Sequence, residues 1–535
     1  MKARILLLPL ALLLILAFAQ CAKRGRPSGG PLDSIPPKPL RINPENYKTN
    51  FTGNSITVHF DEYIRLDKLQ ENLIISPPME TPPNITPHSV SRILEIELKD
   101  SLSPETTYTL NFGNSIVDNN EGNVLEQFKY VFSTGRHIDS LELKGKVIDS
   151  RLLELKKKVG LNLYRLNETY HDSIIQKGKP SYISVTDDAG NFHFTNLEEG
   201  SYLLAAIQKG KDGSPYTYDP ERDKFAFHPT PIKIPSDSTY NLHLYRAHPS
   251  YRLSRPEMEN KNMIRFGYMS DGTQPEIVLQ NKPANLQTRI IKEVDKDSLY
   301  FWYHPSIETD SLHFHVSYKD TIENIGVRVL DEVKDKEFKL SKTDPKSPLD
   351  SLKLRGDTPL ESIDEDFIHV INQDSINIPF NTSMDRLHNI VYISFEQDYE
   401  NRYSLQLYPG AITDWQEETN DTLQYTIRTK AESSFGSLHV NLQGVENYPI
   451  IVDLLNESSK TVQSVYLEKE EQIDFLHLNR GTYYVRVSYD LNKNGKWDPG
   501  NFSTRTQPEP VIFFHIPIDV HANWNVNETF IMPRN

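Results

Sequence analysis

The sequence has 535 residues with a formal net charge of −15, and it contains a single cysteine. Acidic residues outnumber basic ones, 73 to 58, and no long basic run occurs, so a surface that wraps DNA or RNA is excluded. One cysteine excludes disulfide bonds within the chain. Folding therefore rests on apolar burial in domains of ordinary size, of which this length predicts about three to five.

The first 20 residues have the layout of a secretory signal. Lys2 and Arg4 precede an unbroken apolar run, residues 5–19, that is too short to span a bilayer comfortably. No comparable apolar run follows it. We therefore expect an exported chain whose mature part has no membrane-spanning helix.

Cys21 lies directly after this signal, and two interpretations of it stay open. An ordinary signal peptidase would cut after the A-x-A site at residues 17–19 and leave Cys21 as a free thiol. Alternatively, the segment resembles a bacterial lipoprotein signal, in which such a cysteine becomes the lipid-carrying first residue, although Phe18 and Gln20 depart from the family's pattern. That resemblance implies a membrane anchor at Cys21, because several acyl chains on one residue hold a protein stably at a bilayer.

Residues 21–37 are rich in Gly and Pro and predict a flexible tether. From there on, apolar and polar residues alternate in many short segments bounded by turn residues, which is the pattern of half-buried strands. SITVHF at residues 55–60 and LHFHV at residues 312–316 are two examples. Long amphipathic helical windows are scarce, so the pattern predicts an all-β fold of tandem Ig-like and prealbumin-like sandwiches.

Two internal repeats organise the chain. Residues 107–135 and 402–430 share a Y-x-L, an Ile followed two positions later by Asp, a polar turn and a closing alternating strand. Residues 192–213 and 473–495 share the frame F-x-x-L-x-x-G-x-Y and then an apolar strand. The glycine of this second frame falls where a tight turn would need a positive φ.

The region 36–136, with PPKPLRINPENY, ITVHFDEYI, LSPETTYTLNF and FSTG, resembles the bacterial Ig-like domain of exported proteins. TDDAGNFHFTNLEEGSYLLAA, residues 186–206, resembles prealbumin-like, carboxypeptidase-regulatory-like β-sandwiches. The whole chain looks like the Ig-like-domain lipoproteins of Bacteroidota. This resemblance implies a domain architecture and a cellular location but no catalytic activity. We expect a signal peptide at 1–20, a tether at 21–37, a bacterial Ig-like domain at 38–136, a prealbumin-like sandwich at 138–247, a degenerate sandwich at 248–354, an Ig-like sandwich at 355–432 and a prealbumin-like sandwich at 433–535.

DLNKNGKWD, residues 490–498, has the spacing of a calcium loop, because oxygen-bearing side chains at alternate positions before a Gly bend can wrap a hard cation. The twelfth position is Asn501 rather than Glu, and the matching loop of the earlier repeat, KGKDGSPY, lacks the spacing. The alternative is a strand-connecting loop in which Asn494-Gly495 makes a turn and Trp497 packs on the sandwich edge. Apart from a structural Ca²⁺ in this loop we expect no cofactor. The candidate ligands are Asp490, Asn492, Asn494, Lys496 and Asp498.

Asp-Ser or Asp-Thr followed by an aliphatic residue recurs through the chain. The tripeptide resembles the O-glycosylation acceptor of exported Bacteroidota proteins. Asp and Ser also end turns by bonding to their own backbone just before a strand begins. The two interpretations are compatible, because turn-to-strand junctions are exposed. The candidate acceptors are Ser101, Ser140, Ser173, Ser298, Ser311, Thr321, Ser375 and Thr422.

The sequence contains no G-x-S-x-G, no H-E-x-x-H and no P-loop, so no catalytic residue is predicted. Tyr216, Tyr218 and the aromatic run at 301–303 suit sugar stacking if they are exposed, or complete a sandwich core if they are buried. We predict a non-catalytic scaffold whose modules contact an envelope protein or a glycan. A surface glycan-binding accessory is the alternative, and an envelope enzyme comes third.

The lipoprotein resemblance also implies a location. Ala22 stands where an inner-membrane retention signal would usually have Asp, which favours the outer membrane, with the lipid as the membrane contact. The residues that follow are basic, whereas the acidic tag that sends such lipoproteins to the cell surface is missing. We therefore expect the protein to face the periplasm.

Overall fold

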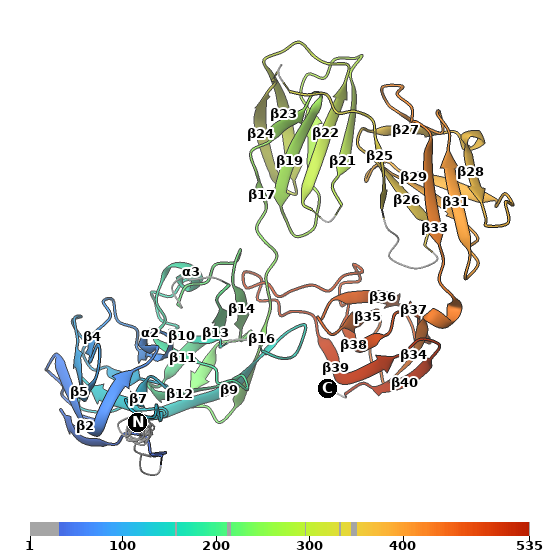
Figure 1. The fold of residues 1–535 in the computed structure, drawn as a ribbon. Helices are drawn as coiled ribbons and strands as arrows, with labels where there is room; N and C mark the ends of the chain where they lie inside the picture. Colours follow the sequence, from blue (N-terminus) through green and yellow to red (C-terminus); the bar gives the residue numbers. More distant parts are fainter. Residues whose placement is uncertain are drawn as a thin grey trace, which may run out of the picture. The chain divides into compact units, whose positions relative to one another are not determined.

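The computed structural model describes residues 32–155, 158–210, 216–294, 296–330, 333–343 and 350–533. Here the chain is built almost entirely of strands, which form five tandem β-sandwiches, so the predicted all-β fold is confirmed (Figure 1). No helix in these residues is long and apolar enough to cross a membrane. The predicted signal peptide and Cys21 lie outside the described residues. Of the described residues, 32–140 and 196–198 form one compact unit, and the others form a second.

The first sandwich pairs a sheet of four strands in a row with a sheet of three. Its elements are β1 (Pro39–Asn43), β2 (Ser55–Leu66), α2 (Leu69–Asn72), β3 (Ile74–Ser76), β4 (Asn84–Thr86), β5 (Ser91–Glu97), β6 (Thr107–Asn111), β7 (Ile116–Asp118) and β8 (Lys129–Ser133). The sheet orders are β1-β2-β5-β4, with β7 added to β2, and β3-β6-β8. Ile56, Val58 and Phe60 alternate along β2 and are at most 2% exposed. The period of two therefore places one face of the strand in the core.

The third and fourth sandwiches follow the same plan. The third consists of β17 (Arg252–Leu253), β18 (Glu257–Asn260), β19 (Met263–Met269), β20 (Glu276–Leu279), β21 (Gln287–Lys292), β22 (Ser298–His304), β23 (Ser311–Tyr318) and β24 (Thr321–Arg328). The fourth consists of β25 (Leu340–Thr343), β26 (Leu352–Gly356), β27 (Leu360–Ile363), the 3₁₀ turn η1 (Glu365–Phe367), β28 (Ile368–Ile371), β29 (Phe380–Asp385), β30 (Ile390–Phe395), β31 (Arg402–Leu407), β32 (Ile412–Asp414) and β33 (Leu423–Arg428).

One strand order is shared by these three sandwiches. β2 lies between β1 and β5, β19 between β17 and β22, and β26 between β25 and β30. In the smaller sheets β6, β23 and β31 are central. The first sequence repeat thus corresponds to equivalent strands, and the same order extends to the third sandwich, where the sequence showed only alternation. The domain boundaries stay predictions.

The second and fifth sandwiches share a different plan. The second consists of β9 (Leu141–Asp149), β10 (Gly160–Arg165), α3 (Ile174–Lys177), β11 (Tyr182–Val185), β12 (Asn191–Leu197), β13 (Gly200–Gln208), β14 (Lys224–Phe227), β15 (Ile232–Ile234) and β16 (Thr239–Leu244). The fifth follows the 3₁₀ turn η2 (Glu432–Ser434) and consists of β34 (Gly436–Gln443), β35 (Ile450–Asn456), β36 (Thr461–Leu467), β37 (Ile473–Leu478), β38 (Gly481–Tyr489), β39 (Val511–Val520) and β40 (Asn525–Ile531).

In both, the first strand is flanked by the fourth strand and the last. The orders are β12-β9-β16 and β37-β34-β40, facing β11-β10-β13-β14 and β36-β35-β38-β39. The first and last strands run parallel, β9 with β16 and β34 with β40, whereas β10 with β13 and β35 with β38 in the facing sheets are antiparallel. The second sequence repeat is therefore a repeat of topology.

The expectation of a positive φ at the glycine of this repeat is wrong. Gly200 and Gly481 begin β13 and β38 without a positive φ. Asn196 (φ 60°) and His477 (φ 54°) adopt it instead. The backbone turns near the end of the preceding strand, which leaves the glycine as the first residue of the next one.

A buried carboxylate fixes the polar turn that follows β7. Asp118 is fully buried, and its Oδ1 accepts the backbone N–H groups of Asn120, Glu121 and Gly122 at 2.7–3.0 Å. Its Oδ2 accepts the N–H of Asn123 at 2.8 Å. Burial alone would raise the pKa of Asp118, but these four donors outweigh it and hold the pKa below its usual value. Asp118 therefore stabilises the turn as an anion.

Replacement of Asp118 with Ala should cost the first sandwich about 2–3 kcal/mol of unfolding free energy, because four backbone N–H groups lose a buried, charged acceptor. The pKa is lower in the folded state, so the contribution is present above the unfolded value of 3.8 and is lost as the pH falls through the folded value. Urea unfolding at several pH values would measure both effects. Asp67→Ala, which removes an exposed ion pair, should change little. Equal losses in the two variants would contradict the argument.

Candidate functional site

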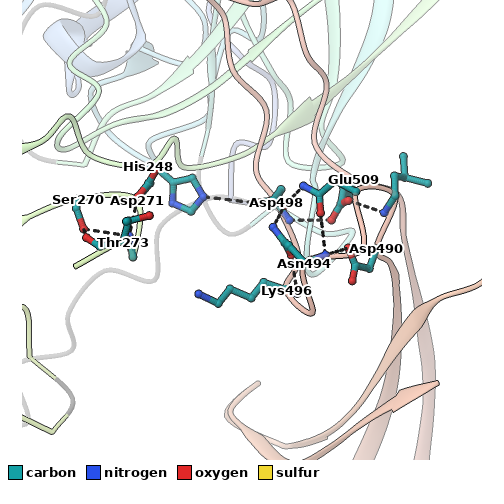
Figure 2. Close-up of polar contacts among 12 residues, drawn as sticks. His248, Ser270, Asp271, Thr273, Asp490, Asn494, Lys496, Asp498 and Glu509 are labelled. Atoms are coloured by element: carbon teal, nitrogen blue, oxygen red, sulfur yellow. Dashed lines mark hydrogen bonds and ion pairs between the residues drawn. The ribbon is translucent and has the colours of Figure 1, made fainter. Parts of the chain in front are cut away.

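The loop that joins β38 to β39 carries the predicted calcium ligands (Figure 2). Two buried carboxylates stand at its two ends. Asp490 follows β38 and is 1% exposed, and Glu509 lies just before β39 and is 7% exposed. Buried carboxylates need donors or cations around them.

Asp490 binds the turn that the sequence predicted. Its Oδ1 accepts the N–H of Asn494 at 3.1 Å, and its Oδ2 accepts the N–H of Gly495 at 2.8 Å. Gly495 has a φ of 77°, which favours glycine. Trp497 is half-buried, and its indole N–H donates to the carbonyl of Glu509 at 2.9 Å. The predicted turn of a strand-connecting loop is therefore present, while Trp497 packs against the core of the second sandwich, with the Arg151 guanidinium 4.8 Å from its ring centroid.

Glu509 is the residue that the sequence analysis missed. Its Oε1 accepts the N–H of Leu491 at 2.7 Å, and its Oε2 accepts the N–H of Asp498 at 2.8 Å. Burial raises the pKa of Glu509, and the charges of Asp498 and Asp490 add to the rise against the two N–H donors. Glu509 lies well beyond the 490–498 motif, so the calcium-loop spacing could not find it.

Asp498 lies over the outer side of the loop. Its Oδ2 accepts the side-chain amides of Asn492 and Asn494 at 2.6 and 2.7 Å, and its Oδ1 is 3.7 Å from Nε2 of His248. The exposed Lys496 side chain extends away from Asp490 and Glu509 (Figure 2). All five predicted ligand residues thus lie in this loop, yet as it stands no group of three His, Cys, Asp or Glu among the described residues is arranged to hold a metal. Calcium stays a prediction.

A cavity of about 270 Å³ lies between the third and fourth sandwiches. Its lining includes Glu259, Glu293, Tyr300 and Trp302. Glu259 forms an ion pair with Arg265, and Glu293 one with Lys296 as well as a bond from the Tyr300 hydroxyl. These two carboxylates are therefore engaged with neighbouring side chains.

The aromatic residues singled out for sugar stacking belong mostly to the interior. Tyr218 is 6% exposed, and the residues of the run at 301–303 are 1–3% exposed. Tyr216 is half-buried. Of the two alternatives, completion of a sandwich core therefore holds for all of them but Tyr216, because neighbouring elements cover them.

The candidate glycosylation sites lie at turns and strand starts. Six of them are exposed, while Ser298 and Ser311 are half-buried. Ser298, Ser311 and Thr321 are the first residues of β22, β23 and β24. The turn-to-strand placement holds at these positions, and glycosylation stays a prediction. The exposed candidates are Ser101, Ser140, Ser173, Thr321, Ser375 and Thr422.

If these tripeptides are acceptors, the exposed sites should carry glycan and the half-buried ones should carry less. Intact-mass measurement of the natively produced protein before and after chemical deglycosylation would show the total. Peptide mapping of Thr321→Ala and Ser311→Ala variants would compare an exposed with a half-buried site. An unchanged mass after deglycosylation would leave only the turn role.

The comparison with known families bears on the first sandwich. Residues 33–134 match the family model of the bacterial Ig-like domain. This supports the predicted bacterial Ig-like resemblance at that place. The comparison with curated proteins gives no match.

Solved structures with similarity include the Bacillus anthracis TIE protein, at 11% identity over 94% of this chain and 76% of that chain, with a TM-score of 0.15. The S-layer protein rSbsC(31-844) gives 10% identity over 88% and 67%, with a TM-score of 0.14. BcpA, the major pilin subunit of Bacillus cereus, gives 9% identity over 74% and 99%, with a TM-score of 0.13. TM-scores this low carry no argument about function. The chain is thus a set of tandem β-sandwiches whose residues 33–134 match the bacterial Ig-like domain family.

Proposed function

We propose that this protein is a non-catalytic scaffold of the cell envelope, anchored by lipid on Cys21 at the periplasmic face of the outer membrane of a Bacteroidota-type bacterium. Its β-sandwiches would present their loops to an envelope protein or a glycan. The observation that supports a scaffold most directly is a contact between the second and fifth sandwiches, which both belong to the second compact unit.

The contact is made by the end of the β38–β39 loop. Asn501 and Thr506 exchange two backbone hydrogen bonds of 2.8 and 2.9 Å, which close a tight turn. Within it the Arg505 guanidinium lies 3.9 Å from the centroid of the Phe502 ring. We call residues 500–507 the docking tip. The Arg505 guanidinium and the Phe502 ring thus lie against each other within the docking tip.

Phe502 enters an aromatic site on the second sandwich. Its ring stands edge-on to Phe225 and Phe227, with centroids 5.5 and 5.2 Å away and interplanar angles of 87° and 85°. Gln507 donates to the carbonyl of Phe227 at 3.2 Å. A Cβ added to Gly500 would lie 2.6 Å from the Tyr245 ring, so a glycine is required for the close approach.

An ion pair lies beside the aromatic contact. Arg505 is 2.5 Å from Asp172, which also accepts the Tyr170 hydroxyl at 2.8 Å. The partially exposed pair contributes little energy and mainly sets orientation. The docking tip thus joins the fifth sandwich to the second, although the two are far apart in the sequence. A scaffold whose modules share a mechanical load needs contacts of this kind.

The junction between the third and fourth sandwiches is also fastened. Trp302 and Trp415 pack edge-on with centroids 6.2 Å apart, and Arg289 donates to the carbonyl of Leu360 at 2.5 Å. Such contacts favour modules that hold fixed positions over modules that swing freely.

Replacement of Phe502 with Ala should release the docking tip, because the aromatic contact contributes about 2 kcal/mol. Hydrogen exchange of residues 500–507 should accelerate, and the radius of gyration of the mature chain should increase. Leu476→Ala removes an exposed leucine from β37 and serves as the matched control. If exchange at the tip is the same in both variants, the docking contact does not hold the two sandwiches together.

Lipid attachment is tested separately. Metabolic labelling with an alkyne fatty acid should mark the wild-type protein and not Cys21→Ala, which should be recovered in the soluble periplasmic fraction. Ala22→Ser should keep the label. A mature amino terminus at Gln20, or an unlabelled wild-type protein, would contradict lipid attachment at Cys21. The proposed membrane location would then lose its support.

A further inference from the structure

In the second and in the fifth sandwich, a carboxylate accepts two backbone N–H groups of the loop that precedes β14 or β39, respectively. In the second sandwich this is Asp223, which is 1% exposed. Its Oδ1 accepts the N–H of Gly210 at 3.1 Å, and its Oδ2 accepts the N–H of Asp219 at 2.9 Å. Gly210 comes two residues after β13, and Asp219 lies in the sequence Tyr-Asp-Pro.

The same two bonds recur in the fifth sandwich. Glu509 accepts the N–H of Leu491, two residues after β38, and the N–H of Asp498, which lies in the sequence Trp-Asp-Pro. Glu509 is therefore the counterpart of Asp223, and Asp498 that of Asp219. The equivalence rests on hydrogen bonds and strand positions together, although the two loops differ in length.

The two loops differ in the residue that directly precedes them. In the second sandwich it is Lys209, whose Nζ lies 2.6 Å from Oδ2 of Asp223 and 3.0 Å from the carbonyl oxygen of Thr217. A buried carboxylate thus has an ammonium ion beside it, bound by a carboxylate and a backbone carbonyl. In the fifth sandwich the equivalent position is Asp490, which is 1% exposed. The fifth sandwich therefore has a carboxylate at the sequence position where the second sandwich has a lysine.

Within the described residues, no lysine or arginine forms an ion pair with Asp490, Asp498 or Glu509. Only His248 approaches, at 3.7 Å from Asp498. The second sandwich therefore has a lysine beside its two carboxylates, Asp219 and Asp223, where the fifth sandwich has a third carboxylate, Asp490. Three carboxylates attached to one loop, with no lysine or arginine paired to them, favour a bound cation.

We propose that the fifth sandwich binds a divalent calcium ion at the place that the Lys209 ammonium takes in the second. The donors are oxygens only, which suits a hard cation. They are the carboxylates of Asp490, Asp498 and Glu509 and the carbonyl of Lys496, which is the counterpart of the Thr217 carbonyl. The side-chain oxygens of Asn492 and Asn494 complete a set of six, within the range of six to eight that calcium takes.

The asparagine side chains are placed to respond to the ion. Both direct their NH₂ groups, the positive ends of the amides, at Oδ2 of Asp498. Their side-chain oxygens accept the backbone N–H groups of Asn494 and Lys496 at 3.1 and 2.8 Å. Each oxygen has a second lone pair that a cation can share, and binding of the cation would replace the amide bonds to Asp498.

Terbium luminescence tests the site on the full mature chain, because Trp497 lies inside the loop and can sensitise a bound Tb³⁺. We expect sensitised emission that calcium displaces, with an apparent dissociation constant of about 0.1–1 mM, as in extracellular calcium modules. Calcium should also raise the thermal midpoint of the fifth sandwich by about 3 °C. Asp188→Asn, which changes an exposed carboxylate of the second sandwich, should behave as wild type.

The decisive variant is Asp490→Lys, which gives the fifth sandwich the ammonium of the second. It should fold, bind no terbium and melt at a midpoint that calcium does not change. Asp498→Asn, a smaller change, should weaken terbium binding at least about tenfold and guards against misfolding of the lysine variant. Wild-type protein that binds neither ion, or an Asp490→Lys variant that binds terbium as tightly as wild type, would overturn the proposal.

Discussion

Burial of one face of each strand against a facing sheet is the interaction on which this protein depends. The chain has no disulfide to supplement it. Leu312, Phe314 and Val316 illustrate the rule in the third sandwich, where they alternate with polar residues along β23 and are at most 6% exposed. Each sandwich has its own cluster of such residues, and that of the second sandwich is completed by Trp497 and Phe502 from the fifth.

Around these cores, buried carboxylates hold the connections in shape. Asp118 and Asp414 end equivalent strands, β7 and β32, and both accept backbone N–H groups of the turn that follows. Asp223 and Glu509 do the same before β14 and β39. In the second pair the two hydrogen bonds are retained while their surroundings differ, since one copy adds Lys209 where the other adds Asp490. A repeated turn thus gives the fold one position that can be adapted without disturbing a strand.

The alternation of SITVHF and LHFHV predicted buried strand faces correctly, because a period of two determines which side chains meet the core. The alternation left the aromatic run at residues 301–303 open between surface and core, and the run is buried partly by Trp415 from another sandwich. The spacing of residues along one strand gives no information about contacts from another sandwich.

The loop at 490–498 shows the same limit. Its turn and its five candidate ligands follow from local spacing, and the positive φ of Gly495 agrees. Glu509 and the docking of Phe502 do not follow, because both depend on residues brought close by the fold. Comparison of the two repeats would have found Glu509, since Asp223 stands at the same place before its strand. Gly200 and Gly481 were misjudged because a conserved-looking glycine was assigned to the turn itself when the bend lies just before it.

The parallel pairing of first and last strands has a mechanical consequence. In the second sandwich six residue pairs join β9 to β16, and in the fifth seven join β34 to β40. The chain enters such a module at one end of this ladder and leaves it at the other. Tension along the polypeptide would then pull the two strands past each other lengthwise and load every rung simultaneously, whereas an antiparallel closing pair would unzip rung by rung.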